Sequence, residues 1–432
     1  MKIFNIKNSL ILFIIICLSS FFNVENRYYQ YLNYLYEDAV FTYIATKYIK
    51  GRNNIETIEN LSEYIAEHVT ADSYSHAPTS EFVALLHGNG LCSVNAIIAL
   101  MLLEKSGVKS RIAHSAVHTF VEINLNGKWI LFEQFGGVLY KNNLDQILTS
   151  KELFWHIKNE KDYLVKKIGR LAVKGSFSNQ DLIFDYIQKL YTPIDYLYLD
   201  YWLKNKKRSF FNIENSFDPK KIEYILISKI NSIFIYCFGK YYLRFIQSIY
   251  FSYLYDSIFN YDETSYIATD FPKTAGFVRL NILNLFSNQD NLTTKELNES
   301  YSILRARCCH LIENYDEEEN IYKNLLKSKL NDKHKLYTLY YYGFLLYKSK
   351  RYSDAIEKFQ ILIHIDQSKS FKIKPVLYFI GRCYEKMGNK TMALEFYKKA
   401  ATTPLRYYSE FQFKRASMHA SQIENSSSLI DP

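Results

Sequence analysis

The Asn126-Gly127 pair constrains the fold of this chain more than any other feature, because it separates two runs rich in apolar and β-branched residues. Asn-Gly is the strongest short-range signal for a two-residue β-hairpin turn. We therefore predict strands over residues 117–125 and 128–132, and a further strand over 111–116. Because 126 and 127 would form the turn, the numbers of any two residues paired across it add up to 253.

Outside this hairpin, the sequence favours helices. The chain has only 14 glycines and 7 prolines in 432 residues, which disfavours architectures built on many tight turns. Apolar residues recur at helical spacing over 55–69, and residues 93–105 form an apolar run that stops at Gly107, a typical C-terminal cap. With 48% hydrophobic residues, the chain can bury the cores of two or three domains. The predicted fold class is α+β, mostly helical with one small antiparallel sheet.

The pattern along the chain predicts five segments. Residues 142–204 are expected to be mainly helical, and residues 218–262 are apolar and aromatic. Within 218–262, every window long enough to span a membrane contains at least one of the polar residues Lys229, Asn231, Lys240 and Arg244. A buried or interfacial helical pair is therefore favoured there over a membrane span. The segments are a leader at 1–23, a domain at 25–165 that contains the hairpin, a helical region of unknown type at 166–290, repeats at 296–410 and a polar tail at 411–432.

The amino-terminal residues have the order of a secretory signal. Lys2 and Lys7 precede residues 10–22, which are apolar apart from two serines and a cysteine. A cleaved signal is favoured over a retained anchor, and a lipoprotein signal ending at Cys17 is disfavoured because Ile16 is bulky. All three place the rest of the chain on the periplasmic or extracellular side, because the positive charges come first. The membrane is a partner if residues 10–22 are retained.

Charge and cysteine content exclude several classes of function. The net charge is +9, but Lys and Arg alternate with Asp and Glu along the whole chain, so we expect no nucleic-acid partner. The six cysteines are irregularly spaced and fit neither a metal-ligand pattern nor a disulfide framework. We expect no metal and no cofactor, and we expect Cys308 and Cys309 to be core residues.

Cys92 is the candidate nucleophile. It stands at the predicted start of the helix that ends near Gly107, where unpaired amides and the helix dipole favour a thiolate. Gly88 and Gly90 precede it and let the backbone turn sharply into the helix, leaving amides free to hold an oxyanion. Asn89 and His87 are candidate oxyanion donors.

The hairpin register supplies a base and an acid. Phe120 would face Glu133, and His118 shares a strand face with Phe120, so Glu133 becomes the diagonal cross-strand neighbour of His118. An imidazole with a carboxyl group behind it can take the thiol proton. His114, a rival base, has no acid partner set by the hairpin, and Glu122 is expected to pair with a basic side chain.

These features, in this order over about fifty residues, resemble the transglutaminase-like superfamily. The cysteine, histidine and aspartate of that family map onto Cys92, His118 and Glu133. The family usually has Asp followed by Pro where this chain has Glu133 and Gln134. The resemblance implies a papain-like fold, a peptide or protein substrate, and a cysteine protease, amidase or acyltransferase that forms a thioacyl intermediate on Cys92.

Residues 300–407 contain a repeated pattern. Its positions are Gly343, Tyr352, Ala355 and Phe359, then Gly381, Lys390, Ala393 and Tyr397, with a weaker earlier copy at Ala306, Tyr315 and Tyr322. The pattern resembles the tetratricopeptide repeat, which implies an α-solenoid that binds a peptide or a partner protein. It leaves open a second interpretation, in which the thiol domain is not catalytic and the protein is a binding scaffold.

Overall fold

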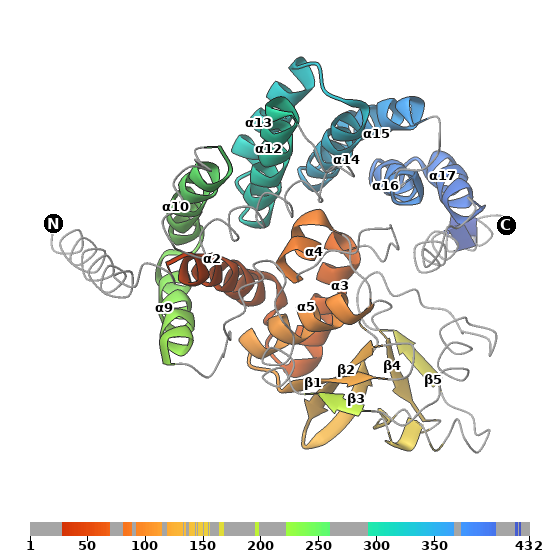
Figure 1. Cartoon of the computed structure of the whole chain (residues 1–432). Helices are drawn as coiled ribbons and strands as arrows, with labels where there is room; N and C mark the ends of the chain where they lie inside the picture. Colours follow the sequence, from red (N-terminus) through yellow and green to blue (C-terminus); the bar gives the residue numbers. More distant parts are fainter. Residues whose placement is uncertain are drawn as a thin grey trace, which may run out of the picture.

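The computed structural model describes the helical core, the sheet and the carboxy-terminal helices (Figure 1). The predicted leader and most of the predicted polar tail lie outside the described residues. The described residues are 28–69, 81–88, 92–114, 119–132, 134, 138–142, 144, 146–149, 151–153, 155, 164–167, 195–197, 222–259, 293–366, 373–402, 420–421 and 423–424. They are mostly helical with a small antiparallel sheet, which confirms the α+β class.

The predicted hairpin is present with the predicted register. Val121 pairs with Phe132 and Leu125 with Lys128, and each pair of numbers adds up to 253. Asn126 and Gly127 both have positive φ, at 52° and 83°, as a type I′ turn requires. The strands are β1 (Ser110–His114), β2 (Thr119–Leu125) and β3 (Lys128–Phe132), with β6 (Asp195–Leu197) on the far side of β1.

The helical prediction for residues 142–204 is wrong where the structure describes them as strands. Strand β5 (Leu164–Lys167) pairs antiparallel with β4 (Val138–Lys141), and β6 pairs with β1. Both β5 and β6 are four residues or fewer, too short for the local pattern to distinguish the two periods. Pairing with a partner distant in sequence decides their conformation.

Helix α5 (Cys92–Lys105) lies between the sheet and a layer of helices. It contacts β1 and β2 on one side and α2 (Tyr28–Ile44) and α3 (Asn54–His68) on the other. Its end is capped as predicted, because Gly107 has φ of 84° and the amide of Val108 donates to the carbonyl of Leu103 at 2.9 Å. The remaining elements of this layer are the π-helix η1 (Ala45–Ile49) and helix α4 (Glu81–His87).

Residues 222–259 form a helical pair, as the sequence predicts. Gly239, with φ of 53°, separates α9 (Ile222–Phe238) from α10 (Lys240–Phe259), and both helices pack against α2. Asn231 is fully buried and its Nδ2 donates to the Leu35 carbonyl at 3.0 Å and to Asp38 Oδ2 at 2.8 Å. In the part of the chain that the structure describes, no helix combines the length and hydropathy needed to cross a bilayer.

Six helices of the carboxy-terminal region form three consecutive pairs. Each helix contacts the next one along the chain, and Figure 1 shows the pairs, coloured teal to blue, in an arc on the side of α3 and α4 that is remote from the sheet. The helices are α12 (Thr294–Leu311), α13 (Tyr315–Lys327), α14 (Asp332–Lys348), α15 (Tyr352–Ile365), α16 (Ile373–Lys386) and α17 (Lys390–Thr402).

The repeated glycines and aromatic residues meet inside each of the last two pairs. A Cβ added at Gly343 would lie 2.6 Å from the ring of Phe359, and one at Gly381 would lie 2.7 Å from the ring of Tyr397. The aromatic ring therefore packs on the glycine of its own pair. Phe359 also stacks on Phe379 of the next pair, with ring centroids 6.3 Å apart, so it joins two pairs as well.

Gly343→Ala should destabilise the protein despite the better helix propensity of alanine. Alanine gains about 1 kcal/mol over glycine in a helix, whereas overpacking a filled core costs about 1–3 kcal/mol. We expect a net loss of about 1 kcal/mol in the free energy of unfolding, measured with urea. In the Phe359→Leu background the same change should be neutral or stabilising, and an equal loss in both backgrounds would contradict the glycine-ring contact.

A second prediction concerns Glu319 on α13, whose Oε1 accepts hydrogen bonds from Arg351 at 2.7 Å and from the Tyr342 hydroxyl at 3.0 Å. Burial raises the pKa of Glu319, but the hydrogen bonds from Arg351, Lys323 and Tyr342 outweigh burial and lower it to about 2. Because the unfolded chain takes up the proton first, this contribution is present above pH 4.5 and lost as pH falls towards 2. Glu319→Gln should therefore destabilise by under about 1 kcal/mol at neutral pH, and urea unfolding should show the difference shrinking below pH 4.5.

Candidate functional site

Cys92 is the first residue of α5, so the candidate nucleophile stands at a helix amino terminus as predicted. Gly88, just after α4, has φ of 67°, and a Cβ there would lie 3.0 Å from the His68 carbonyl oxygen. Glycine is therefore required at this turn. His87 is the last residue of α4. For His87 and Cys92 the structure describes the backbone and not the side chain, and Asn89 lies outside the described residues.

His118 and Glu133 also lie outside the described residues, so their contact stays a prediction. Their neighbours are described. Gln134 is fully buried, and its Nε2 donates to the carbonyl of Thr119, the first residue of β2, at 3.0 Å. This side-chain hydrogen bond lies beyond the last ladder pair, and it joins the residue after Glu133 to the residue after His118.

Two other predicted side chains are accounted for. Glu122 is fully buried and its Oε2 lies 2.5 Å from Arg111 Nε, so it pairs with a basic side chain as predicted. The Arg111 guanidinium also lies over the Trp129 ring, 4.0 Å from its centroid. His114 is the last residue of β1 and pairs through its backbone with Thr119, while its side chain is not described.

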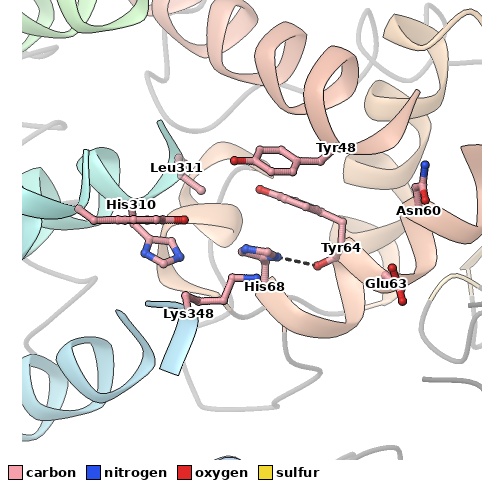
Figure 2. Close-up of a pocket in the computed structure, with 9 residues that line it drawn as sticks. Tyr48, Asn60, Glu63, Tyr64, His68, His310, Leu311 and Lys348 are labelled. Atoms are coloured by element: carbon pink, nitrogen blue, oxygen red, sulfur yellow. Dashed lines mark hydrogen bonds between the residues drawn. The ribbon is translucent and has the colours of Figure 1, made fainter. Parts of the chain in front are cut away.

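The structure adds a pocket that the sequence did not indicate. It lies between the end of α3 and the helix pairs, and Figure 2 shows the rings of His68 and His310 directed towards each other across it. His68 stacks on Tyr64 with centroids 4.1 Å apart, and its Nδ1 donates to the Tyr64 carbonyl at 2.9 Å. The cavity volume is about 130 Å³, and its lining residues are Tyr48, Asn60, Glu63, Tyr64, His68, His310, Leu311, Tyr315 and Lys348. It is too small for most organic ligands.

A buried group of charged residues stands behind this pocket. His310 Nδ1 lies 3.0 Å from Glu318 Oε2, and Arg307 Nη1 lies 4.0 Å from Glu318 Oε1. Burial is the main cause that lowers the pKa of His310 and raises the pKa of Glu318, so both groups favour their uncharged forms. Within the described residues, no group of three or more metal-ligating side chains is placed to hold a metal ion.

Arg307 links this group to the thiol region. Its side chain is 2% exposed, its Nε donates to the Leu86 carbonyl at 2.8 Å, and its guanidinium lies 4.5 Å from the centroid of the Tyr341 ring. Leu86 is in the last turn of α4, two residues before Gly88. The first helix of the repeat region therefore holds the end of the helix that leads to the turn before Cys92.

The sequence does carry a signal for this group. Glu318 occupies the repeat position that is Ala355 and Ala393 in the later pairs, and Arg307 occupies the position of Arg382. A glutamate where the other copies have alanine marks the first pair as different. The first copy of the repeat matches the pattern at only three positions, Ala306, Tyr315 and Tyr322, so the sequence alone does not draw attention to Glu318.

The chain has no significant similarity to any protein-family model, curated protein or solved structure.

Arg307→Met should loosen α4 specifically. The change leaves the buried Leu86 carbonyl without the Arg307 donor, and an unsatisfied buried acceptor costs about 1–3 kcal/mol. Hydrogen exchange of residues 81–88 should accelerate. Arg382→Met is the matched control, because Arg382 has the same repeat position but pairs with Glu385 of its own helix. Equal exchange at 81–88 in both variants would contradict the link.

Proposed function

We propose that this chain is an exported or membrane-anchored thiol enzyme similar to the transglutaminase-like proteins, acting on an amide in a peptide or protein. Cys92 is the nucleophile, His118 the base and Glu133 the acid that orients the imidazole. The observation that carries the proposal is the hairpin register of 253, together with the hydrogen bond from the Gln134 side chain to the Thr119 carbonyl. If that register held for one more residue on each strand, Glu133 would lie diagonally across from His118.

The position of Cys92 supports the nucleophilic role. Helix α5 begins at Cys92, and the unpaired amides at the start of a helix favour the thiolate of a cysteine placed there. The same amides, with Asn89 or His87, are the candidate donors to the oxyanion that forms during attack. Gly88 has φ of 67°, a conformation that suits the sharp turn the proposal expects before the helix.

The connection between α5 and the sheet supports the approach of His118. Only residues 106–109 separate the end of α5 from the start of β1, and β1 packs against α5. Strand β1 therefore runs back along the helix, and the start of β2 lies towards the helix's beginning. His118 directly precedes β2 in the sequence, which supports the expectation that it approaches Cys92.

The reaction that follows is acyl transfer. His118 takes the thiol proton, and the thiolate attacks the amide carbonyl to give a tetrahedral intermediate held by the oxyanion donors. The C–N bond breaks as the imidazolium protonates the leaving amine, which leaves a thioacyl group on Cys92. Water then attacks with His118 as base and releases the acid, and an amine in place of water would give transfer. Hydrolysis is favoured because no described feature identifies an acceptor-amine site.

The carboxy-terminal helix pairs favour a second activity, partner binding. The contact of Gly343 with Phe359 and of Gly381 with Tyr397 recurs from pair to pair, which supports a solenoid similar to tetratricopeptide repeats. Such a solenoid would present a peptide or protein to the thiol domain. In the alternative function, the thiol domain is inactive and the chain is a scaffold that binds through these pairs alone.

Alkylation of the folded full-length protein distinguishes the thiol enzyme from the inactive scaffold. Iodoacetamide at pH 6 should modify Cys92 at least about tenfold faster than an ordinary exposed thiol, because a lowered thiol pKa raises the thiolate fraction. Cys237 is the internal control, since it is exposed, whereas Cys308, Cys309 and Cys383 are buried. Mass spectrometry of tryptic peptides gives both rates in one sample.

The variants define the roles. His118→Ala should abolish the advantage of Cys92 over Cys237, Glu133→Gln should reduce it, and Glu133→Asp should retain most of it. Equal rates at Cys92 and Cys237 in the native protein would rule out the enzyme and leave the scaffold function.

A further inference from the structure

Helices α9 and α10 carry an exposed apolar surface. Tyr236 is 92% exposed and Tyr241 is 71% exposed, on either side of the turn at Gly239. Single exposed apolar residues are common, but a cluster of large ones marks an interaction surface. We define the tyrosine face as the exposed residues Ile225, Leu226, Ile233, Tyr236, Tyr241 and Phe245.

The tyrosine face is separate from the side of each helix that packs in the core. On α9, Ile227, Asn231 and Phe234 are buried, and α9 contacts α2. On α10, Leu243 and Ile246 are buried. Both helices are therefore apolar on two sides. The hydrophobic effect buries one side in the core, and the other side stays exposed to water.

The charge of this segment identifies the partner. The two helices contain Lys229, Lys240 and Arg244, and their acidic residues, Glu223 and Asp256, stand at the start of α9 and near the end of α10. Lys229 is exposed on α9, whereas Arg244 donates to Asn314 Oδ1 at 2.9 Å. Tyrosines with lysines and apolar residues, and no acidic group between them, suit helices that lie in the headgroup region of an anionic bilayer.

The position of the tyrosine face fits a bilayer. Both α9 and α10 pack against α2, and Figure 1 shows the start of α2 (dark red) at the same edge of the molecule as these two helices. Helix α2 begins at Tyr28, and five residues separate it from the apolar residues 10–22. Five residues reach no further than about 20 Å when extended. A bilayer that holds residues 10–22 would therefore lie close to this edge.

We propose that the tyrosine face rests on the surface of an anionic phospholipid membrane. Tyr236, Tyr241 and Phe245 lie at headgroup depth, and Lys229 and Lys240 face lipid phosphates. The helices lie along the bilayer and do not cross it. The thiol domain and the helix pairs are then held at a fixed distance from the membrane, which confines the protein to substrates near that surface.

Quenching by brominated lipids tests this proposal on the full-length protein. Tyr236→Trp places a reporter in the tyrosine face, and Met387→Trp places the control at an exposed apolar position on the carboxy-terminal helices. Each variant is mixed with vesicles of phosphatidylcholine and phosphatidylglycerol carrying bromine on the acyl chains, and the quenching of the unsubstituted protein is subtracted. The Tyr236→Trp signal should be quenched at least about twofold more than the control.

The charge and the alternative occupants are tested in the same assay. Lys229→Glu with Lys240→Glu, or vesicles of phosphatidylcholine alone, should reduce the quenching of Tyr236→Trp towards the control level. Equal quenching of the two reporters would overturn the proposal. So would a blue-shifted Tyr236→Trp emission without bromine quenching, because a second copy or a protein partner would then cover the face. Quenching that is unchanged in phosphatidylcholine would overturn the assignment to anionic lipid.

Discussion

The buried guanidinium of Arg307 is the interaction on which the arrangement of this protein depends. Arg307 Nε donates to the Leu86 carbonyl of α4, and Arg307 Nη1 lies 4.0 Å from Glu318 Oε1 of α13, close to that carboxyl but beyond hydrogen-bond distance. These two groups belong to different parts of the chain. Moving α12 away from α4 would therefore remove the hydrogen-bond acceptor of a buried guanidinium.

The hydrogen bond of Arg307 connects the helix pairs to the segment that precedes Cys92. Leu86 is in the last turn of α4, and the glycine turn before Cys92 follows directly, so the geometry of the turn is supported by α12. The pocket between His68 and His310 lies at the same junction.

The helices α9 and α10 show how an apolar segment is divided between two environments. Asn231 interrupts the apolar run in the sequence, yet it is buried because Leu35 and Asp38 on α2 accept its hydrogen bonds. Lys229, which interrupts the same run, is exposed. Both residues interrupt the apolar run, but they differ in what they contact: Asn231 fixes α9 to the core, and Lys229 adds charge to the tyrosine face.

The elements that carry the candidate site could be predicted from the sequence, because their determinants are local, whereas the contacts among Cys92, His118 and Glu133 stay predictions. Asn126-Gly127 sets the turn and hence every pair along the hairpin, Gly107 ends α5, and the start of that helix at Cys92 follows from the glycines before it. The repeat positions Gly343 and Phe359 could also be predicted from the sequence, since the pattern recurs at a fixed spacing.

The tertiary structure decided what depends on partners distant in sequence. The sequence predicts helix where β5 and β6 form. Segments of four residues or fewer are too short to show a helical or a strand period, so pairing with β4 and β1 decides their conformation. The pairing of Arg307 with Leu86 joins residues 221 positions apart, and no local pattern encodes such a contact. The sequence by itself determined the turns, the caps and the order of the candidate residues, because these follow from backbone preferences of single residues. Only the tertiary structure decided which charges are buried together and which apolar side of α9 and α10 remains exposed, because burial is a property of the assembled core.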